Sequence, residues 1–408
     1  MKRAGPWSRP LCVWAGPRSW STFCAHVSDV PRTHSAANAG RSPAAIVLVG
    51  LLGLAGMVYL IWPKRPAVEH TVASEAGSAW ELRADKAVLS GSTMGTSFTV
   101  VLAGEGLERA GLEQLQAEID AELASVNAQM STYLDDSELS RFNAAGAGAA
   151  VEVSADLLEV VALARQVNER SGGAFDVTVG PLVDAWGFGP GQADPSERRE
   201  LSDAQIDELR AVVGDARLEL DLDGLTLKKP VDGLHVDLSA IAKGHGCDRV
   251  AALVDAAGHE HYMIEIGGEV RVKGLNPGGD PWRVGIERPT ADGAGSRAVQ
   301  AIVRVSDVAV ATSGDYRNYW ERDGVRYSHT IDPRSGRPID HRLASVTVVH
   351  PESAALADAW ATALNVLGPD EGLALAEQIG LAAYFLVRTD EGFEVRATAP
   401  FARYSDSK

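Results

Sequence analysis

The stretch Met263-Ile-Glu-Ile-Gly-Gly-Glu-Val270 decides much of the fold, and it lies between two further unusual strings. Val236-Asp-Leu-Ser-Ala-Ile-Ala-Lys-Gly244 comes before it, and Ala311-Thr-Ser-Gly-Asp-Tyr-Arg317 comes after it. Its alternating apolar residues predict a strand that ends at two glycines, Gly267 and Gly268, where another molecule can approach the backbone closely. Because the preceding string carries an Asp and a Lys at a predicted strand-to-helix turn, the combination suits a phosphorylated ligand.

Helical and strand-like patterns surround these strings in alternation. Apolar residues at steps of three and four predict helices over residues 112–131, 157–167, 240–257, 354–367 and 369–379. Short apolar runs predict strands over residues 98–102, 218–222, 262–266, 282–286, 299–305, 344–349 and 382–387. The sequence therefore predicts an α+β fold.

The composition is that of a folded, acidic protein. The chain has 408 residues, of which 45% are hydrophobic, which is enough for a sizeable core. The part up to Arg65 has a net charge of +7, so the remainder carries −24 of the total charge of −17. A body this acidic repels a phosphate backbone, and no basic stripe offsets it. We therefore expect no nucleic-acid partner.

The change of charge coincides with a membrane signal. Residues 44–62 are nineteen residues without a charge, which is long enough to cross a bilayer as one transmembrane helix. The basic segment 1–43 before it favours a cytoplasmic N-terminus, so the body would lie outside the cytoplasm. A cleaved signal peptide is the alternative, although the apolar run is long for one. Residues 63–80 are predicted to be a linker and residues 81–404 the catalytic domain.

The cysteines do not form a disulfide framework. Cys12 and Cys24 precede the apolar run, which leaves Cys247 alone in the body, and no CxxC or Cys/His metal spacing occurs. Cys247 lies in an apolar helical stretch, where we expect a small buried residue.

A glycine-rich loop with three aromatic residues spans residues 172–189. Five glycines with Phe175, Trp186 and Phe188 suit a tight loop that lines a flat, aromatic-tolerant pocket. The structural alternative is a buried turn whose aromatic side chains only fill the core.

Three further strings carry five residues whose types suit catalysis. Lys243 can add a charge to an anion at a helix N-terminus, and Asp237 can meet a sugar hydroxyl or a metal-bound water, although a surface ion pair is the simpler reading. Asp358 and Thr362 share a helix face because they are four residues apart, which permits a Mg²⁺ site without proving one. His329 precedes an Asp-Pro-x-x-Gly turn and is a candidate general base or a structural histidine.

These strings occur in an order that resembles one family. The blocks are Met94-Gly-Thr96, Ser131-Thr-Tyr133 with Asp136-Ser-Glu-Leu-Ser-Arg-Phe-Asn143, Phe175-Asp176 through Trp186-Gly-Phe-Gly189, 237–244, Gly267-Gly-Glu269, 311–317, 329–336 and 358–362. The chain resembles the ApbE-type flavin transferases, the FAD:protein FMN transferases. The resemblance implies a two-lobed fold with mixed sheets and packed helices, preceded here by the transmembrane helix.

The resemblance also implies a reaction and its site. A periplasmic enzyme of this kind binds FAD and Mg²⁺, moves FMN onto a threonine or serine hydroxyl of an acceptor flavoprotein, and releases AMP. The implied FAD contacts are Met94, Tyr133, Ala174, Phe175, Asp176, Asp237, Lys243 and the strand at Thr330. The implied metal ligands are the Ala240 carbonyl oxygen and the side chains of Asp358 and Thr362. With these assigned, Gly267 and Gly268 are interpreted as one wall of the FAD pocket.

The reaction needs a base, a metal and an acceptor. One Mg²⁺ and one Lys can supply much of the charge neutralisation that breaks a pyrophosphate, and His329 is the first choice of base, with Asp332 second. Family acceptors carry an Asp-x-x-[Ser/Thr]-Gly-Ala-[Ser/Thr] segment, which is absent here, so we expect no self-flavinylation. The alternatives are an FAD pyrophosphatase that gives FMN and AMP, and a non-catalytic periplasmic flavin carrier. The expected location is the inner membrane, single-pass, with the catalytic domain in the periplasm.

Overall fold

The computed structural model describes residues 70–73, 79–189, 198, 200–289, 298–315, 319–322 and 325–405. The predicted basic segment 1–43, the predicted transmembrane segment 44–62 and most of the predicted linker lie outside these residues. No helix within the described part of the chain combines the length and the apolarity that are needed to cross a bilayer. The predicted catalytic domain is nearly all described.

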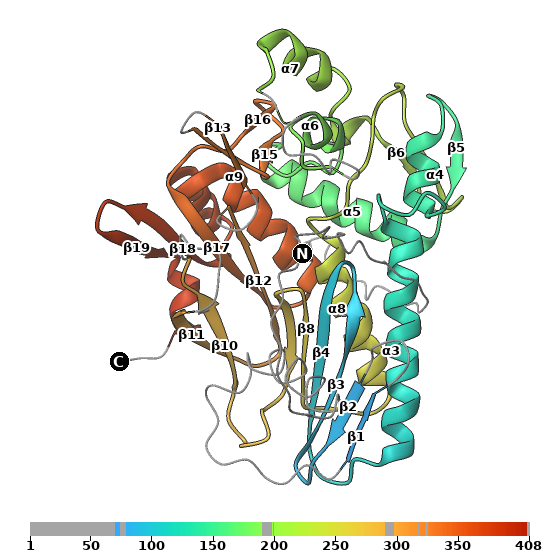
Figure 1. Cartoon of the computed structure of the whole chain (residues 1–408), viewed down its shortest axis with the longest axis vertical. Coiled ribbons are helices and arrows are strands. Elements are labelled where there is room, and N and C mark those ends of the chain that lie inside the picture. Colours follow the sequence, from blue (N-terminus) through green and yellow to red (C-terminus); the bar gives the residue numbers. More distant parts are fainter. Residues whose placement is uncertain are drawn as a thin grey trace, which may run out of the picture.

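A ten-stranded sheet forms the centre of the molecule (Figure 1). Its strand order is β1-β2-β3-β4-β8-β9-β12-β17-β18-β19. The strands are β1 (His70–Ala73), β2 (Ala79–Leu82), β3 (Lys86–Thr93), β4 (Thr96–Ala103), β8 (Tyr262–Ile266), β9 (Glu269–Lys273), β12 (Val308–Gly314), β17 (Leu343–His350), β18 (Ala382–Thr389) and β19 (Gly392–Ala397). Alternate apolar side chains let both faces of the sheet carry buried residues.

Two hairpin turns of two residues each fix how β3 pairs with β4 and how β8 pairs with β9. Met94 and Gly95 join β3 to β4 with φ of 49° and 64°, and Gly267 and Gly268 join β8 to β9 with φ of 61° and 110°. Hairpins with two-residue loops favour such left-handed residues because the turn then follows the twist of the strands. Met94 is uncommon there because a side chain at positive φ is strained.

Four long helices form one layer, and the first, third and fourth of them pack against one face of the sheet. They are α3 (Arg109–Met130), α5 (Ala155–Arg170), α8 (Ala242–Ala256) and α9 (Ala354–Gln378). In Figure 1, α3 stands along one edge while α8 and α9 lie against the sheet, and α8 packs on both α3 and α9. Their apolar stripes and the near face of the sheet form the largest core, in which the predicted free Cys247 is buried.

Smaller elements cover the other face and build a small lobe. The hairpin of β10 (Trp282–Glu287) and β11 (Val299–Val305) packs with η4 (Ala399–Tyr404) in the second core. The third core lies among α6 (Gly180–Ala185), α7 (Asp203–Arg210), β13 (Tyr319–Arg322), β14 (Val325–Ser328), β15 (Ile331–Asp332) and β16 (Arg337–Pro338). The remaining elements are α4 (Glu138–Ala144), β5 (Ala150–Glu152), η3 (Asp215–Arg217), β6 (Glu219–Asp221) and β7 (Thr226–Lys228).

The α+β prediction is confirmed, with two corrections. The expectation of mixed sheets is wrong, because every strand pair in the described residues is antiparallel and only an isolated bridge between Val179 and His235 is parallel. The predicted strand-to-helix turn at Leu238 is also wrong: residues 229–241, which lead directly into α8, form no strand, and α8 begins at Ala242. The Asp237 carboxylate accepts from the Ser239 amide (2.8 Å), so a side-chain turn replaces the first helical turn.

The predicted break in the last helix is confirmed. Residues 354–378 form one continuous run, α9, but Gly368 has φ 78° and ψ −173°, and Pro369 follows it. Proline has no amide hydrogen and fixes its own φ, so it begins the second segment after a sharp change of direction.

The contact between α8 and α9 makes a strong prediction about Gly244. A Cβ there would lie 2.2 Å from the Ala354 carbonyl oxygen and 2.7 Å from the Ala355 nitrogen, and these are backbone atoms that cannot rotate away. We expect Gly244→Ala to lower the unfolding free energy by about 2 kcal/mol or more, because the two helices must separate. Gly111→Ala is the control, since nothing lies within 4 Å of that position in α3, and it should stabilise by about 0.5–1 kcal/mol. Urea unfolding followed by circular dichroism checks both signs, and equal effects would contradict the packing argument.

Candidate active site

Three charged side chains from three elements meet where α8 begins. Lys243 comes from the first turn of α8, Glu269 is the first residue of β9, and Asp358 comes from the second turn of α9. The Lys243 ammonium lies 3.1 Å from Glu269 Oε1 and 3.3 Å from Asp358 Oδ2. Both carboxylates are nearly buried, with 5% and 7% of their side chains exposed. We call these three residues the charged cluster.

The charged cluster holds one positive and two negative groups when all are ionised. Burial lowers the pKa of Lys243, but attraction by the carboxylates of Asp358 and Glu269 is the larger effect. The pKa of Lys243 is therefore raised above its ordinary value. Burial and the nearby Asp358 raise the pKa of Glu269. An excess of buried negative charge is costly unless a proton or another cation compensates it. The electrostatics therefore favour a cation at this place.

The backbone near the charged cluster offers another oxygen. In a regular helix the Gly244 amide would donate to the Ala240 carbonyl, but here it donates to Asp358 Oδ2 (3.2 Å). That leaves the Ala240 carbonyl oxygen without this helical partner. Thr362 is half-buried one helical turn after Asp358. A carbonyl, a carboxylate and a hydroxyl are all hard oxygen donors of the kind that Mg²⁺ prefers.

This oxygen set fits a divalent cation, although it contains few side-chain ligands. Among the described residues, no group of three or more His, Cys, Asp or Glu side chains is arranged to hold a metal. A site built on Ala240, Asp358 and Thr362 would leave positions for water or for substrate phosphates, as Mg²⁺ sites usually do. The structure thus places Asp358 of α9 against the start of α8, with Thr362 one turn further along α9.

The two glycine turns form the edge of the site. A Cβ on Gly267 would lie 2.9 Å from Thr96 Cγ2 and 3.2 Å from Lys243 Cδ, so the β8–β9 turn packs on the Lys243 stem. The Met94 methyl group reaches α8, because a Cβ on Gly246 would lie 2.8 Å from Met94 Cε. Nothing lies within 4 Å of a Cβ at Gly268. The predicted residues Met94, Lys243, Gly267 and Gly268 therefore surround the start of α8.

A second group of predicted residues gathers around Asp237, in the segment that leads into α8. Asp237 is half-buried, and its charge acts on both Tyr133 and Asp184. The pKa of Tyr133 is raised by partial burial and by the carboxylates of Asp237 and Asp184, although the side chain is 59% exposed. An exposed aromatic ring next to two carboxylates suits contact with a ligand that carries a flat ring and hydroxyl groups.

The glycine-rich loop is partly structural. Ala174 and Phe175 are buried in the main core, so the Phe175 ring fills space there. The Asp176 carboxylate accepts from the amides of Thr178 (2.8 Å) and Asp215 (3.0 Å) and from Asn168 Nδ2 (3.2 Å). Any contact of these three residues with a ligand would therefore come through the backbone or the loop shape rather than through a free side chain.

The third group lies around the connection from β14 to β15 and contacts α9 through Thr330. His329 is half-buried after β14 and makes an edge contact with Phe188 at 6.4 Å between ring centroids. The hydroxyl of Thr330 accepts from Asn365 Nδ2 on α9 (3.4 Å), and its carbonyl accepts from the Ile339 amide (3.0 Å). Asp332 is paired with the Arg334 guanidinium (3.0 Å). His329 is thus the better base of the two predicted candidates, because the charge of Asp332 is already neutralised.

Two residues of the site were missed by the sequence prediction. Glu269 was read only as the end of the double-glycine string, although a buried acid directly after a tight turn is a signal in itself. Asp184 lies in α6, which begins at Gly180-Pro181, and its side chain lies against Gly189. Burial and the charge of Asp237 raise the pKa of Asp184 to about 6, and such shifts are frequent at functional sites.

The raised pKa of Asp184 predicts that ionisation of this carboxyl lowers the unfolding free energy at neutral pH. Its folded pKa of about 6 exceeds the ordinary 3.8, so the folded state binds the proton more tightly and stability falls as the pH rises from about 4 to about 6. Asp184→Asn removes this cost, and we expect it to raise the unfolding free energy at pH 7.5 by about 1–2 kcal/mol. The difference should shrink as the pH falls and vanish below about pH 3, because the wild-type carboxyl is then protonated in both states. Urea unfolding at the two pH values tests this, and a pH-independent difference would contradict it.

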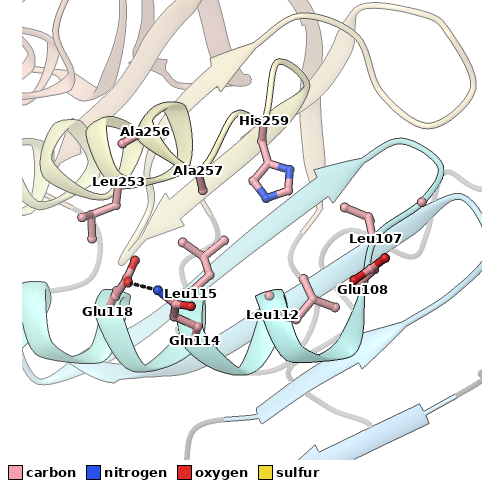
Figure 2. Close-up of a pocket in the computed structure, with 12 residues that line it drawn as sticks. Leu107, Glu108, Leu112, Gln114, Leu115, Glu118, Leu253, Ala256, Ala257 and His259 are labelled. Atoms are coloured by element: carbon pink, nitrogen blue, oxygen red, sulfur yellow. Dashed lines mark hydrogen bonds between the residues drawn. The ribbon is translucent and has the colours of Figure 1, made fainter.

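A separate cavity lies at the far end of α8 (Figure 2). It has a volume of about 480 Å³ and is lined by the start of α3, including Leu112, by the end of α8, including Leu253, and by His259, which follows α8. The 15 residues of α8 span roughly 20 Å, so this cavity is remote from the charged cluster. We assign it no part in the site.

Comparison with known proteins gives a consistent result. The sequence profile of the ApbE family matches residues 94–385. The FAD:protein FMN transferase of Vibrio cholerae serotype O1 is 47% identical over 79% of this chain and 93% of its own length, and that of Haemophilus influenzae is 44% identical over 78% and 92%. The solved flavin transferase ApbE from Vibrio cholerae superposes with a TM-score of 0.71 at 46% identity, over 79% of this chain and all of the other. The apo form of the flavinyl transferase ApbE from Pseudomonas stutzeri also has a TM-score of 0.71, at 42% identity over 79% of this chain and 98% of the other.

Proposed function

Since this chain belongs to the ApbE family and is a transferase, an FAD:protein FMN transferase, we propose that it moves the FMN half of FAD onto a threonine or serine hydroxyl of an acceptor flavoprotein. The second product is AMP, and the cofactor is Mg²⁺. The observation that carries this proposal is the charged cluster at the start of α8, where the Gly244 amide donates to Asp358 in place of the Ala240 carbonyl. It supplies an ammonium for phosphate and oxygen ligands for a divalent cation at one place.

The residues of the site have separate tasks in this reaction. Mg²⁺, when held by the Ala240 carbonyl, Asp358 and Thr362, would neutralise charge on the pyrophosphate. Lys243 attracts the same phosphates from the first turn of α8, and the two glycine turns let the ligand approach the backbone. Tyr133 and Asp237 contact the rest of the FAD. These residues orient the phosphorus for attack from the side opposite to AMP.

Proton transfer completes the scheme. The acceptor hydroxyl oxygen forms a bond to the FMN phosphorus while the bond from that phosphorus to the AMP oxygen breaks. We assign the hydroxyl proton to His329, which lies at the edge of the Phe188 ring, because the alternative base Asp332 is already paired with Arg334. The pairing of Asp332 with Arg334 instead stabilises the turn that carries His329.

The acceptor and the location extend the proposal. The acceptor segment is of the type Asp-x-x-[Ser/Thr]-Gly-Ala-[Ser/Thr], and this chain itself contains none. We propose that the segment 44–62 anchors the enzyme in the inner membrane by a single pass, with the catalytic domain in the periplasm. The acceptor is then an exported or membrane flavoprotein.

A mass measurement separates this function from its alternatives. The purified chain, FAD, Mg²⁺ and an acceptor domain with the segment should give an acceptor heavier by one FMN and an equal amount of AMP. The control is the same acceptor with alanine in place of the hydroxyl residue, which should stay unmodified. AMP release without the adduct would show a pyrophosphatase, and FAD binding with neither product would show a carrier.

A further inference from the structure

Lys243 and a divalent cation compete for the same carboxylate. Asp358 is the only side-chain carboxylate in the proposed metal site, yet its Oδ2 already lies 3.3 Å from the Lys243 ammonium and 3.2 Å from the Gly244 nitrogen. A lysine without another anionic partner would stay on Asp358 and repel a cation that approaches it. The site therefore needs a second place for the Lys243 charge.

Glu269 provides that place and is firmly held. Its Oε1 lies 3.1 Å from the Lys243 ammonium, and only 5% of its side chain is exposed. Its backbone carbonyl accepts from the thiol of Cys247 (3.4 Å), one helical turn after Lys243 in α8. Its buried Oε2 has no hydrogen-bond partner within the described residues, so it can accept a second ammonium hydrogen. Both oxygens are thus available to Lys243.

We propose that Glu269 is a positioning residue that keeps the Lys243 ammonium off Asp358 when the divalent cation binds. The inference rests on the proposed function, because it assumes the metal site at Ala240, Asp358 and Thr362. With Glu269 present, Lys243 remains neutralised and directed at the phosphates while the Asp358 carboxylate turns to the cation. Without it, the ammonium has only Asp358 as an anionic partner and excludes the cation.

A double-mutant cycle on metal binding tests this role directly. Free Mn²⁺, a probe for the Mg²⁺ site, is measured by electron paramagnetic resonance during titration of the wild type, Glu269→Gln, Lys243→Met and the double variant. We expect Glu269→Gln to weaken Mn²⁺ binding by about tenfold, the size typical of groups that support metal ligands. In the Lys243→Met background the same change should matter less than about threefold, because the competing ammonium is gone.

The matched control removes a neighbouring carboxylate that serves the turn instead. Glu265→Gln keeps the acceptor for the Gly268 amide (2.7 Å in the wild type) and should change Mn²⁺ affinity by less than threefold. Circular dichroism verifies that each variant is folded. A second readout is the Mg²⁺ concentration for half-maximal FMN transfer, which should rise about tenfold in Glu269→Gln while kcat at saturating Mg²⁺ changes much less.

Each other outcome has a definite meaning. Equal weakening by Glu269→Gln in both backgrounds would overturn the inference, because Glu269 would then act on the metal directly. Unchanged affinity in Glu269→Gln would overturn it as well. A wild type that binds no Mn²⁺, with or without FAD, would instead refute the proposed metal site, and the inference would fall with it.

Discussion

Asp358→Asn should lower kcat/KM for FMN transfer by about 100- to 1,000-fold while the protein stays folded. In the proposed site this carboxylate is the one charged ligand of the cation, and loss of metal-ion charge stabilisation costs several kcal/mol in the transition state. Asn has the same shape and can still accept the Gly244 amide, so the α8–α9 contact should survive. Removal of one negative charge from the charged cluster should not lower stability, because that cluster carries excess negative charge.

The measurement is transfer kinetics over a range of Mg²⁺ concentrations, together with thermal unfolding. Asp370→Asn is the matched control: Asp370 lies on the same helix, but its side chain is 89% exposed and pairs with Arg396 at the surface. It should keep transfer activity within about twofold and stability within about 0.5 kcal/mol. Full activity of Asp358→Asn would exclude the metal assignment, and a large loss of stability would mean that the residue is mainly structural.

Arg249→Ala should be the most destabilising single change in the helical layer. The Arg249 guanidinium on α8 lies 2.7 Å from Glu122 on α3 and 3.5 Å from Asp156 at the start of α5. All three side chains are at most 8% exposed, and burial raises the pKa of Asp156 to about 6 even with Arg249 present. Removal of the arginine leaves two buried carboxylates without a cation, which costs about 3–5 kcal/mol.

Chemical unfolding at pH 7 measures this effect. Arg109→Ala is the control, because its pair with Glu113 is exposed on both sides and should contribute less than about 0.5 kcal/mol. In Arg249→Ala the denaturant concentration at the midpoint of unfolding should also rise as the pH falls from 7 to 5. The two carboxyls that have lost their cation then take up protons, which removes the buried negative charge. A loss below about 1 kcal/mol would mean that water enters the cluster, and the buried-charge argument would then fail.

The elements with strong local patterns were predictable. The strand prediction 262–266 matches β8, and 299–305 matches β11, because short runs of apolar and β-branched residues specify a strand without knowledge of its partners. The start of α8 was missed, since the Asp237 side chain captures the Ser239 amide and delays the helix to Ala242. Such competition between a side chain and the helix depends on backbone geometry that periodicity does not contain.

The site was predictable only where its residues share one element. Asp358 and Thr362 were paired by their spacing on a single helix, and that spacing holds in α9. The resemblance supplied Met94, Tyr133 and Ala240, which local patterns alone did not. The resemblance also supplied Asp176, whose carboxylate is engaged with the loop and with the Asp215 amide.

What the sequence determined by itself is the class of fold, the acidic body and the family to which the chain belongs, because these follow from composition, periodicity and ordered motifs. What only the tertiary structure decided is the place of the charge: Lys243 lies between Glu269 and Asp358, residues 26 and 115 positions away in the chain. The double-glycine turn after β8 matters for this reason, since it places the buried Glu269, the first residue of β9, beside Lys243 on α8. Ion pairing depends on distance in space and on burial, and neither is fixed until the helices pack on the sheet.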